Sequence, residues 1–171
     1  IRADNNKSEY KILASFADTE YKLSCIKAAV INKSIHILMM TEKNMSCGII
    51  HLKLSQGKWH RKLICSFNDC CCKFIMTSNL SGISLLIMTY NDHKKNHYIA
   101  EWSFDNDEWS KLKEINELNK SDELPSMILT EKGLLLAWFD KSRKILNTML
   151  KGSDKVYSKN VQIIDQSVPS L

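Results

Sequence analysis

A repeat of about 49 residues is the feature that most constrains how this chain can fold. Aromatic residues follow short polar turns at spacings of 49, 50 and 48 residues, at Tyr10, Trp59, Trp109 and Tyr157. The most apolar stretches keep the same period, with spacings of 49 and 50, and begin at Ile35, Ser84 and Leu134. Two unrelated landmarks that share one period indicate an internal structural repeat.

Within each repeat the pattern indicates four short strands joined by hairpin-length turns. The stretch after the aromatic alternates in character, as strands do. This alternation predicts that the side chains on one face of the first such strand are Trp59, Arg61, Leu63 and Cys65. By the same reasoning, the next repeat places on one face Trp109, Lys111, Lys113 and Ile115. Clusters of Asn, Asp, Ser and Gly separate the strands, as expected of turns, and no helix is required.

Four antiparallel strands repeated every 40 to 50 residues or so are typical of β-propeller blades. We therefore predict an all-β chain that forms a single propeller-like unit. Its three complete blades are expected at residues 20–68, 69–118 and 119–166, with the outer strand of a preceding blade at 8–19 and the start of a next blade at 167–171. Three blades do not close a ring, so we expect an exposed apolar face at each end, and either a longer chain or an oligomer.

Composition excludes several classes of protein. With 44% hydrophobic and 25% charged residues, the chain is neither disordered nor a membrane protein, and no apolar run is long enough to span a bilayer. The net charge of +5 is spread among interspersed acids and bases. The densest basic clusters, at residues 58–62 and 93–97, have acidic residues nearby and are interpreted as solvated turns. We therefore expect neither a membrane nor a nucleic acid as partner.

The six cysteines stand at positions 25, 47, 65, 70, 71 and 72. Their clustering does not resemble a disulfide framework, and no C-x-x-C pair suggests a structural zinc site. We expect reduced cysteines that pack as small hydrophobic residues. Reduced cysteines and the lack of a visible secretory leader favour a cytoplasmic location.

The third repeat resembles the blades of sialidase-like propellers, a group that also includes fucose-type lectins. It has a Pro-Ser opening at Pro125 and Ser126, a turn at Gly133, and an apolar strand that ends near Trp138 and Asp140. An aromatic-Ser pair follows, at Tyr157 and Ser158. The middle repeat hints at the sialidase Asp-box turn with Ser103, Asp105 and Trp109. This resemblance implies a propeller and a relation to glycan-binding or glycan-processing proteins.

Catalytic and metal sites find little support in the sequence. The arginine triad of a sialidase is missing, since the three arginines do not occupy equivalent places in the repeats. Asp92, Glu101 and Asp140 are possible members of a glycosidase carboxylate pair but are interpreted as turn residues. His93 and His97 have a metal-ligand spacing, but they lie in a polar hairpin with no third ligand. We therefore expect no enzyme activity, no metal and no cofactor.

Two functions remain. The first is a non-enzymatic propeller-type module that binds a protein partner or a second copy of itself through its open ends. The second is carbohydrate binding, or a remnant of a glycan-processing propeller, because aromatic and acidic residues lie close together in the sequence. The candidate ligand-binding residues are Tyr90, Asp92, Glu101, Trp102, Trp138 and Asp140.

Overall fold

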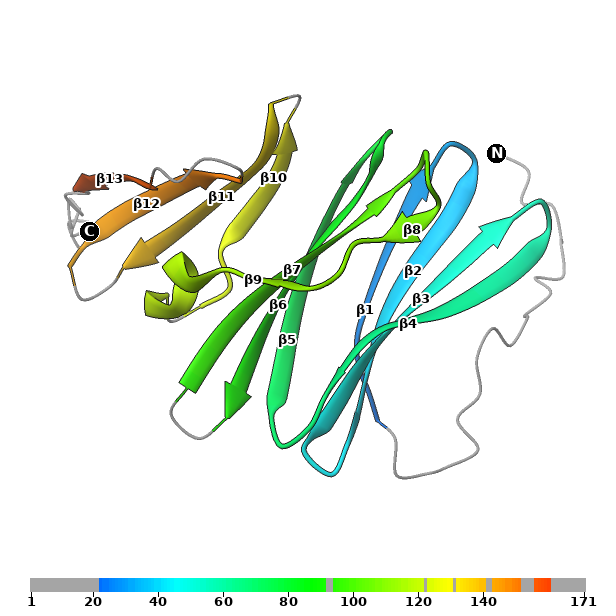
Figure 1. Ribbon diagram of the computed structural model, residues 1–171, viewed down its shortest axis with the longest axis horizontal. Coiled ribbons are helices and arrows are strands. Elements are labelled where there is room, and N and C mark those ends of the chain that lie inside the picture. The colour runs from blue at the N-terminus through cyan, green and yellow to red at the C-terminus, as the bar shows by residue number, and fades with distance from the viewer. Residues whose placement is uncertain are drawn as a thin grey trace, which may run out of the picture.

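The computed structural model describes residues 22–91, 94–121, 123–130, 132–140, 143–151 and 156–160. The predicted strand at 8–19 and the predicted blade start at 167–171 lie outside these residues. The described residues form three antiparallel sheets that follow one another along the chain, so the predicted all-β class is confirmed (Figure 1). The closure of such sheets into a propeller stays a prediction.

Sheet 1 is a four-stranded meander with two-residue turns. Its strands in order are β1 (Lys22–Ile31), β2 (Ser34–Lys43), β3 (Ser46–Ser55) and β4 (Lys58–Phe67). The central turn residues all have positive φ: Asn32 and Lys33, then Asn44 and Met45, then Gln56 and Gly57. Two consecutive positive φ angles match the right-handed twist of the flanking strands, which is why such turns make tight hairpins.

Sheet 2 repeats this meander with an interrupted last strand. Its strands are β5 (Cys71–Asn79), β6 (Gly82–Asn91), β7 (Lys94–Ser103), β8 (Glu108–Trp109) and β9 (Lys113–Glu114), of which β8 and β9 both pair with β7. Asn79 fixes the first turn, because its side-chain Oδ1 accepts hydrogen bonds from the backbone N–H groups of Ser81 (2.9 Å) and Gly82 (3.1 Å).

Sheet 3 follows a short 3₁₀ helix, η1 (Asn116–Lys120), an element that the sequence analysis did not require. Its strands are β10 (Ser126–Thr130), β11 (Gly133–Asp140), β12 (Ile145–Leu150) and β13 (Val156–Asn160), in this order across the sheet. Leu118 of the helix is fully buried and packs against the core between sheets 2 and 3.

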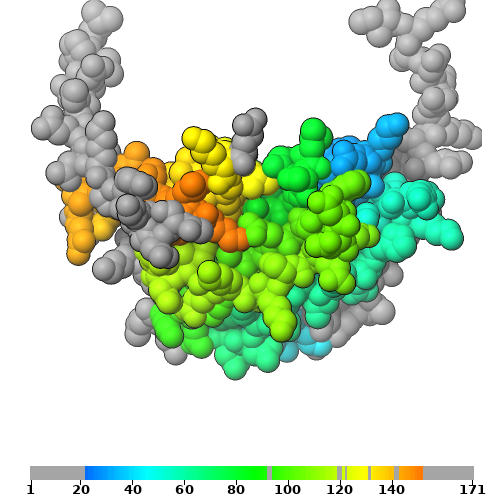
Figure 2. Space-filling model, turned by 45° about the horizontal axis from the view of Figure 1, so that its top comes forward, coloured from blue at the N-terminus to red at the C-terminus, as the bar shows by residue number. Residues whose placement is uncertain are grey.

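The three sheets pack face to face in the order of the chain. β5 lies against β1 on one side and β10 on the other, so the first strands of the sheets are neighbours. One apolar core lies between sheets 1 and 2, with fully buried Leu38, Ile49 and Leu85. A second core lies between sheets 2 and 3 around Leu86 and Leu136. In the space-filling view the blue and cyan of sheet 1 lie on the right, the greens of sheet 2 in the middle, and the yellow and orange of sheet 3 on the left (Figure 2).

The outer strands change face part-way along their length, which corrects the predicted alternation. In β4 the register shifts by one residue, so that Cys65 pairs with Ile49 and Leu63 with Ile50. Cys65 therefore enters the core between sheets 1 and 2, whereas Leu63 is 58% exposed on the other face. A β-bulge has this effect, because successive side chains on a strand point to opposite faces.

Sheet 2 contains the same shift. Trp109 pairs with Trp102, and Lys113 pairs with Ile99, which leaves one extra residue between β8 and β9. Trp109 packs against the core between sheets 1 and 2, whereas Ile115 belongs to the core between sheets 2 and 3. The prediction that these two residues share a face is therefore wrong.

The prediction that all six cysteines are reduced is wrong for Cys47 and Cys72, which form a disulfide between β3 and β5. Their Cα atoms are 6.4 Å apart, within the range that a disulfide can bridge. Packing of sheet 1 on sheet 2 creates this proximity, which the separation of 25 residues in the sequence does not indicate. The free cysteines Cys65 and Cys70 are buried, as expected of small hydrophobic residues.

Candidate functional site

The predicted ligand-binding residues do not form one site. Trp138 is only 6% exposed and packs in the core between sheets 2 and 3. The Asp140 carboxylate accepts a hydrogen bond from the backbone N–H of Arg143 (3.0 Å) and thereby holds the β11–β12 turn. Trp138 thus packs on the inner face of sheet 3, and Asp140 contacts the backbone of the adjacent turn.

The other described residues of the set, Tyr90, Glu101 and Trp102, belong to sheet 2 and have different partners. The ring of Tyr90 lies near the ammonium groups of Lys73 and Lys95, each 5.9 Å from its centroid. Glu101 forms an ion pair with Lys151 of sheet 3. Asp92 lies outside the described residues. Trp138 lines a groove with Ser121, Glu123 and Ser126. Trp102 lines a different groove, which brings several charged side chains together.

This groove lies between sheets 1 and 2, beside the turn that connects β7 to β8. Its volume is about 240 Å³, and it is lined by aromatic and charged side chains: His51, Lys53, His60, Arg61, Lys62, Trp102, Asp107 and Trp109. The β3–β4 pairing provides the basic residues, since Lys53 pairs with His60 and His51 with Lys62. The β7–β8 hairpin provides both tryptophans and the aspartate.

Asp107 lies in the β7–β8 turn, where its φ is +54°, and it contacts two residues that line the groove. Its carboxylate forms an ion pair with the Lys53 ammonium (2.7 Å) and accepts a hydrogen bond from the Trp102 indole N–H (3.2 Å). Burial opposes ionisation of Asp107, but the hydrogen bond and charge of Lys53 outweigh it and lower the pKa of the carboxyl. The Lys53 ammonium also lies 5.3 Å from the centroid of the Trp102 ring.

At the base of the groove, four rings contact one another in a row that we call the histidine–tryptophan cluster: partly buried Trp109, then His51, His36 and Trp102, which are buried. The Trp109 indole N–H donates to His51 Nδ1 (3.0 Å), and His51 Nε2 lies 3.0 Å from His36 Nδ1. Because an indole N–H only donates, neutral His51 must carry its proton on Nε2 and donate it to His36. His36 then carries its proton on Nε2, which has no partner among the described residues.

The cluster keeps its histidines neutral. The pKa of His51 is lowered from 6.5 to about 4, mainly by burial and next by His36, with Lys53 and Lys62 acting in the same direction and Asp107 opposing them. The pKa of His36 is also lowered, first by burial and then by Lys53. Both imidazoles are therefore neutral near pH 7, and each lies in contact with an indole ring.

His36 and His51 are not among the predicted ligand-binding residues, although the sequence contains a pattern that marks them as unusual. Each histidine interrupts an apolar strand, in IHILMM and in IIHLKL. His36 pairs with Lys53, and Leu38 pairs with His51, so the two histidines are diagonal neighbours on one face of sheet 1. This diagonal depends on the β2–β3 register, which follows from the two-residue turn at Asn44 and Met45.

Replacing Trp109 by phenylalanine should destabilise the protein by about 1 to 3 kcal/mol, because the buried Nδ1 of His51 loses its donor. Urea unfolding, followed by circular dichroism, measures this change. Trp59→Phe is the matched control, since Trp59 packs on the other face of sheet 1, away from the cluster. Equal destabilisation by the two substitutions would contradict the assigned hydrogen bond.

A second feature with functional potential is the face of sheet 1 that points away from sheet 2, which we call the outward face of sheet 1. Register places on it the apolar residues Ile26, Val30, Ile35, Ile37, Met39, Ile50, Leu52 and Leu63. Several of them are exposed, among them Val30 (71%) and Ile26 (52%). A small cluster of buried residues lies on this face, and all of its described residues belong to sheet 1.

The outward face of sheet 3, which points away from sheet 2, is also apolar. By register it carries Ile128, Leu135, Ala137, Phe139, Leu146 and Leu150. Ile128 is 59% exposed and Leu146 is 39% exposed. Contiguous apolar surface of this kind marks interaction sites in soluble proteins.

No family model, curated protein or solved structure matches the chain. Within the described ranges, no helix has the length and apolar character needed to cross a membrane.

Proposed function

We propose that this chain is a non-enzymatic binding or assembly module of the propeller type, in which the outward faces of sheets 1 and 3 pack against further sheets. The supporting observation is that both ends of the stack are apolar. Sheet 2 buries both of its faces, one against each neighbour, whereas sheets 1 and 3 each bury one face against described residues.

The outward face of sheet 1 corresponds to the face of sheet 2 that packs on sheet 1, and this correspondence supports a head-to-tail arrangement of successive sheets. Trp59 and Trp109 occupy corresponding positions on sheets 1 and 2, and Trp109 is covered by sheet 1. The face that carries Trp59 would be covered in the same way by the outward face of another sheet like sheet 3. Such a contact is heterologous, so it closes only when the rotation between sheets completes a ring. The partner is either a further part of a longer chain or a second copy.

The test is the solution mass of the chain by analytical ultracentrifugation. We expect an assembly larger than 19.7 kDa. Val30→Asp combined with Ile26→Asp should return the protein to a monomer with unchanged circular dichroism, because charge on an apolar contact is costly to bury. Leu80→Asp is the matched control, since Leu80 is 77% exposed in the β5–β6 turn and lies on neither outward face. A wild-type chain that stays monomeric at high concentration would exclude a second copy as the partner of the outward faces.

A second candidate function is carbohydrate binding in the groove between sheets 1 and 2. The observation that favours it is the combination of Trp102 and Trp109 with Asp107 and Lys53 in one concave site. Aromatic rings contact the apolar faces of sugars, and the charged groups match their hydroxyls. Binding on a glycan array that is lost with Asp107→Ala, and kept with Asp105→Ala, would support this function. No binding to any glycan would exclude it.

A further inference from the structure

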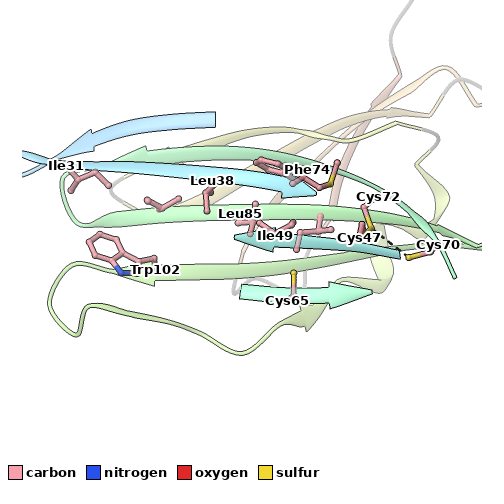
Figure 3. Packing of buried hydrophobic residues seen from close by; sticks show 13 residues of the cluster. Ile31, Leu38, Cys47, Ile49, Cys65, Cys70, Cys72, Phe74, Leu85 and Trp102 are labelled. Atoms are coloured by element: carbon pink, nitrogen blue, oxygen red, sulfur yellow. Dashed lines mark hydrogen bonds between the residues drawn. A yellow bond between two sulfur atoms is a disulfide. The ribbon is translucent and has the colours of Figure 1, made fainter. Parts of the chain in front are cut away.

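Three sulfur atoms meet at one end of the core between sheets 1 and 2. Cys47, Cys70 and Cys72 are all buried, and their Sγ atoms lie within 4.8 Å of one another. Figure 3 shows these three residues at the opposite end of the core from Trp102, with Cys65 apart from them. We call them the three-sulfur cluster.

The backbone fixes the positions of these cysteines from two sheets. Cys47 lies near the start of β3, and Cys72 lies near the start of β5. Cys70 precedes β5, and its backbone N–H donates to the Met45 carbonyl in the β2–β3 turn (2.7 Å). The cluster is therefore built by the packing of sheet 1 on sheet 2 and does not depend on a long loop.

Cys70 is the one residue of the three-sulfur cluster that is not part of the disulfide. Its Sγ lies 3.8 Å from Cys72 Sγ. Zinc binds thiolate sulfur at about 2.3 Å, so two thiolates of a tetrahedral zinc site are about 3.8 Å apart. The Cys70–Cys72 distance thus already equals the edge of such a site, and Cys47 lies within reach of both sulfurs.

We propose that the three-sulfur cluster binds a zinc ion when the Cys47–Cys72 disulfide is reduced. A thiol reductant first converts the disulfide into two thiols and is itself oxidised to a disulfide. Zinc then displaces the three thiol protons and forms three Zn–S bonds. The oxidised protein cannot bind zinc in this way, because two of the three sulfurs are bonded to each other.

The fourth ligand is a water molecule that enters from the surface. Cys70 lines an opening of about 260 Å³ that is also lined by Cys71, Lys22 and Lys43. Three thiolates on Zn²⁺ leave one negative charge. The charged side chains that line this opening, Lys22, Glu42 and Lys43, together carry one positive charge, which offsets it. Copper(I) would leave two negative charges in the same buried position, which favours zinc.

The test uses the full chain, reduced with a phosphine, loaded with Zn²⁺ and desalted. We expect about one zinc per chain by atomic spectroscopy, and a thiolate-to-cobalt charge-transfer band when Co²⁺ replaces zinc. Air-oxidised protein should hold no zinc. Cys70→Ser should lower zinc affinity by about 100-fold, because changes even in outer-shell partners reach this size.

Two control variants separate the proposed site from incidental thiol binding. Cys71→Ser alters the exposed neighbour, and Cys65→Ser alters a buried cysteine outside the cluster. Both should bind zinc as the wild type does. Circular dichroism of oxidised Cys70→Ser checks its folding, since its disulfide remains possible. Zinc retained by Cys70→Ser, zinc lost equally in Cys71→Ser, or binding of Cu(I) without Zn²⁺ would overturn the proposal.

Discussion

Replacing Gly82 by alanine is expected to destabilise the protein by roughly 3 kcal/mol or more. Gly82 begins β6 and pairs with Ser103 of β7. A Cβ at this position would lie inside contact distance of the Trp102 carbonyl oxygen, which is a backbone atom. Relief would require the β6–β7 ladder to separate, because a backbone oxygen cannot turn away as a flexible side chain can.

The surroundings of Gly82 leave little freedom for such a movement. The Gly82 N–H donates to Asn79 Oδ1, and the Phe104 N–H donates to the Ser81 carbonyl (2.9 Å). The Trp102 side chain is 2% exposed in the core between sheets 1 and 2. Movement of its backbone would therefore disturb the histidine–tryptophan cluster as well.

Gly48→Ala is the control for this prediction. A Cβ at Gly48 would meet its nearest atoms, on Leu63 and Thr41, at 3.6 Å, which is ordinary van der Waals contact. We expect this substitution to leave stability nearly unchanged or slightly increased, since alanine restricts the unfolded chain. Chemical denaturation of the two variants measures the difference, and similar midpoints for both would contradict the predicted steric conflict.

Acid should destabilise the protein well before its carboxylates are protonated. The pKa of His51 is about 4 in the folded protein against 6.5 for an unperturbed histidine. Between pH 6.5 and about pH 4, His51 binds a proton in the unfolded chain but stays neutral in the folded protein. Stability is therefore highest above pH 6.5 and falls as the pH drops, by about 2 kcal/mol from pH 7 to about pH 5. The lowered pKa of His36 acts in the same direction.

The measurement is a set of urea unfolding curves at several pH values. In His51→Gln the decline in stability between pH 7 and pH 5 should become shallower, because the buried imidazole of His51 is removed. His60→Gln is the matched control, since His60 is exposed on β4 and its replacement should leave the slope unchanged. An equally steep decline in His51→Gln would show that this histidine does not control the acid response.

Much of the strand arrangement could be predicted because it depends on local chemistry. The clusters of Asn, Asp, Ser and Gly that predict turns include Asn32, which begins the two-residue turn between β1 and β2, since Asn tolerates positive φ. The apolar stretch from Ser84 lies within β6, whose central residues are buried on both faces. Such stretches identify central strands because neighbouring sheets cover both of their sides.

The candidate site could be predicted only in part, because it depends on pairing between distant residues. Trp102 was selected for its chemistry, but its partners His51 and Lys53 come from sheet 1 and enter the site through cross-strand register. Tyr90 and Glu101 were selected for the same kind of chemistry and find their partners elsewhere. The disulfide between Cys47 and Cys72 likewise depends on the packing of two sheets.

The register shift of the outer strands has a consequence for how the repeats are compared. Cys65 follows Trp59 by six residues, and Ile115 follows Trp109 by six residues. In a strand without a bulge, two residues six positions apart would point to the same face. Here the aromatic residue and the apolar residue six positions later point to opposite faces of their sheet. The same spacing separates Tyr10 from Phe16 and Tyr157 from Ile163. Deletion of the one extra residue would remove the bulge and still leave the second apolar side chain in its present interface, because an interval of five in a regular strand joins opposite faces. The six-residue interval therefore belongs together with the bulge, and both are part of the repeat.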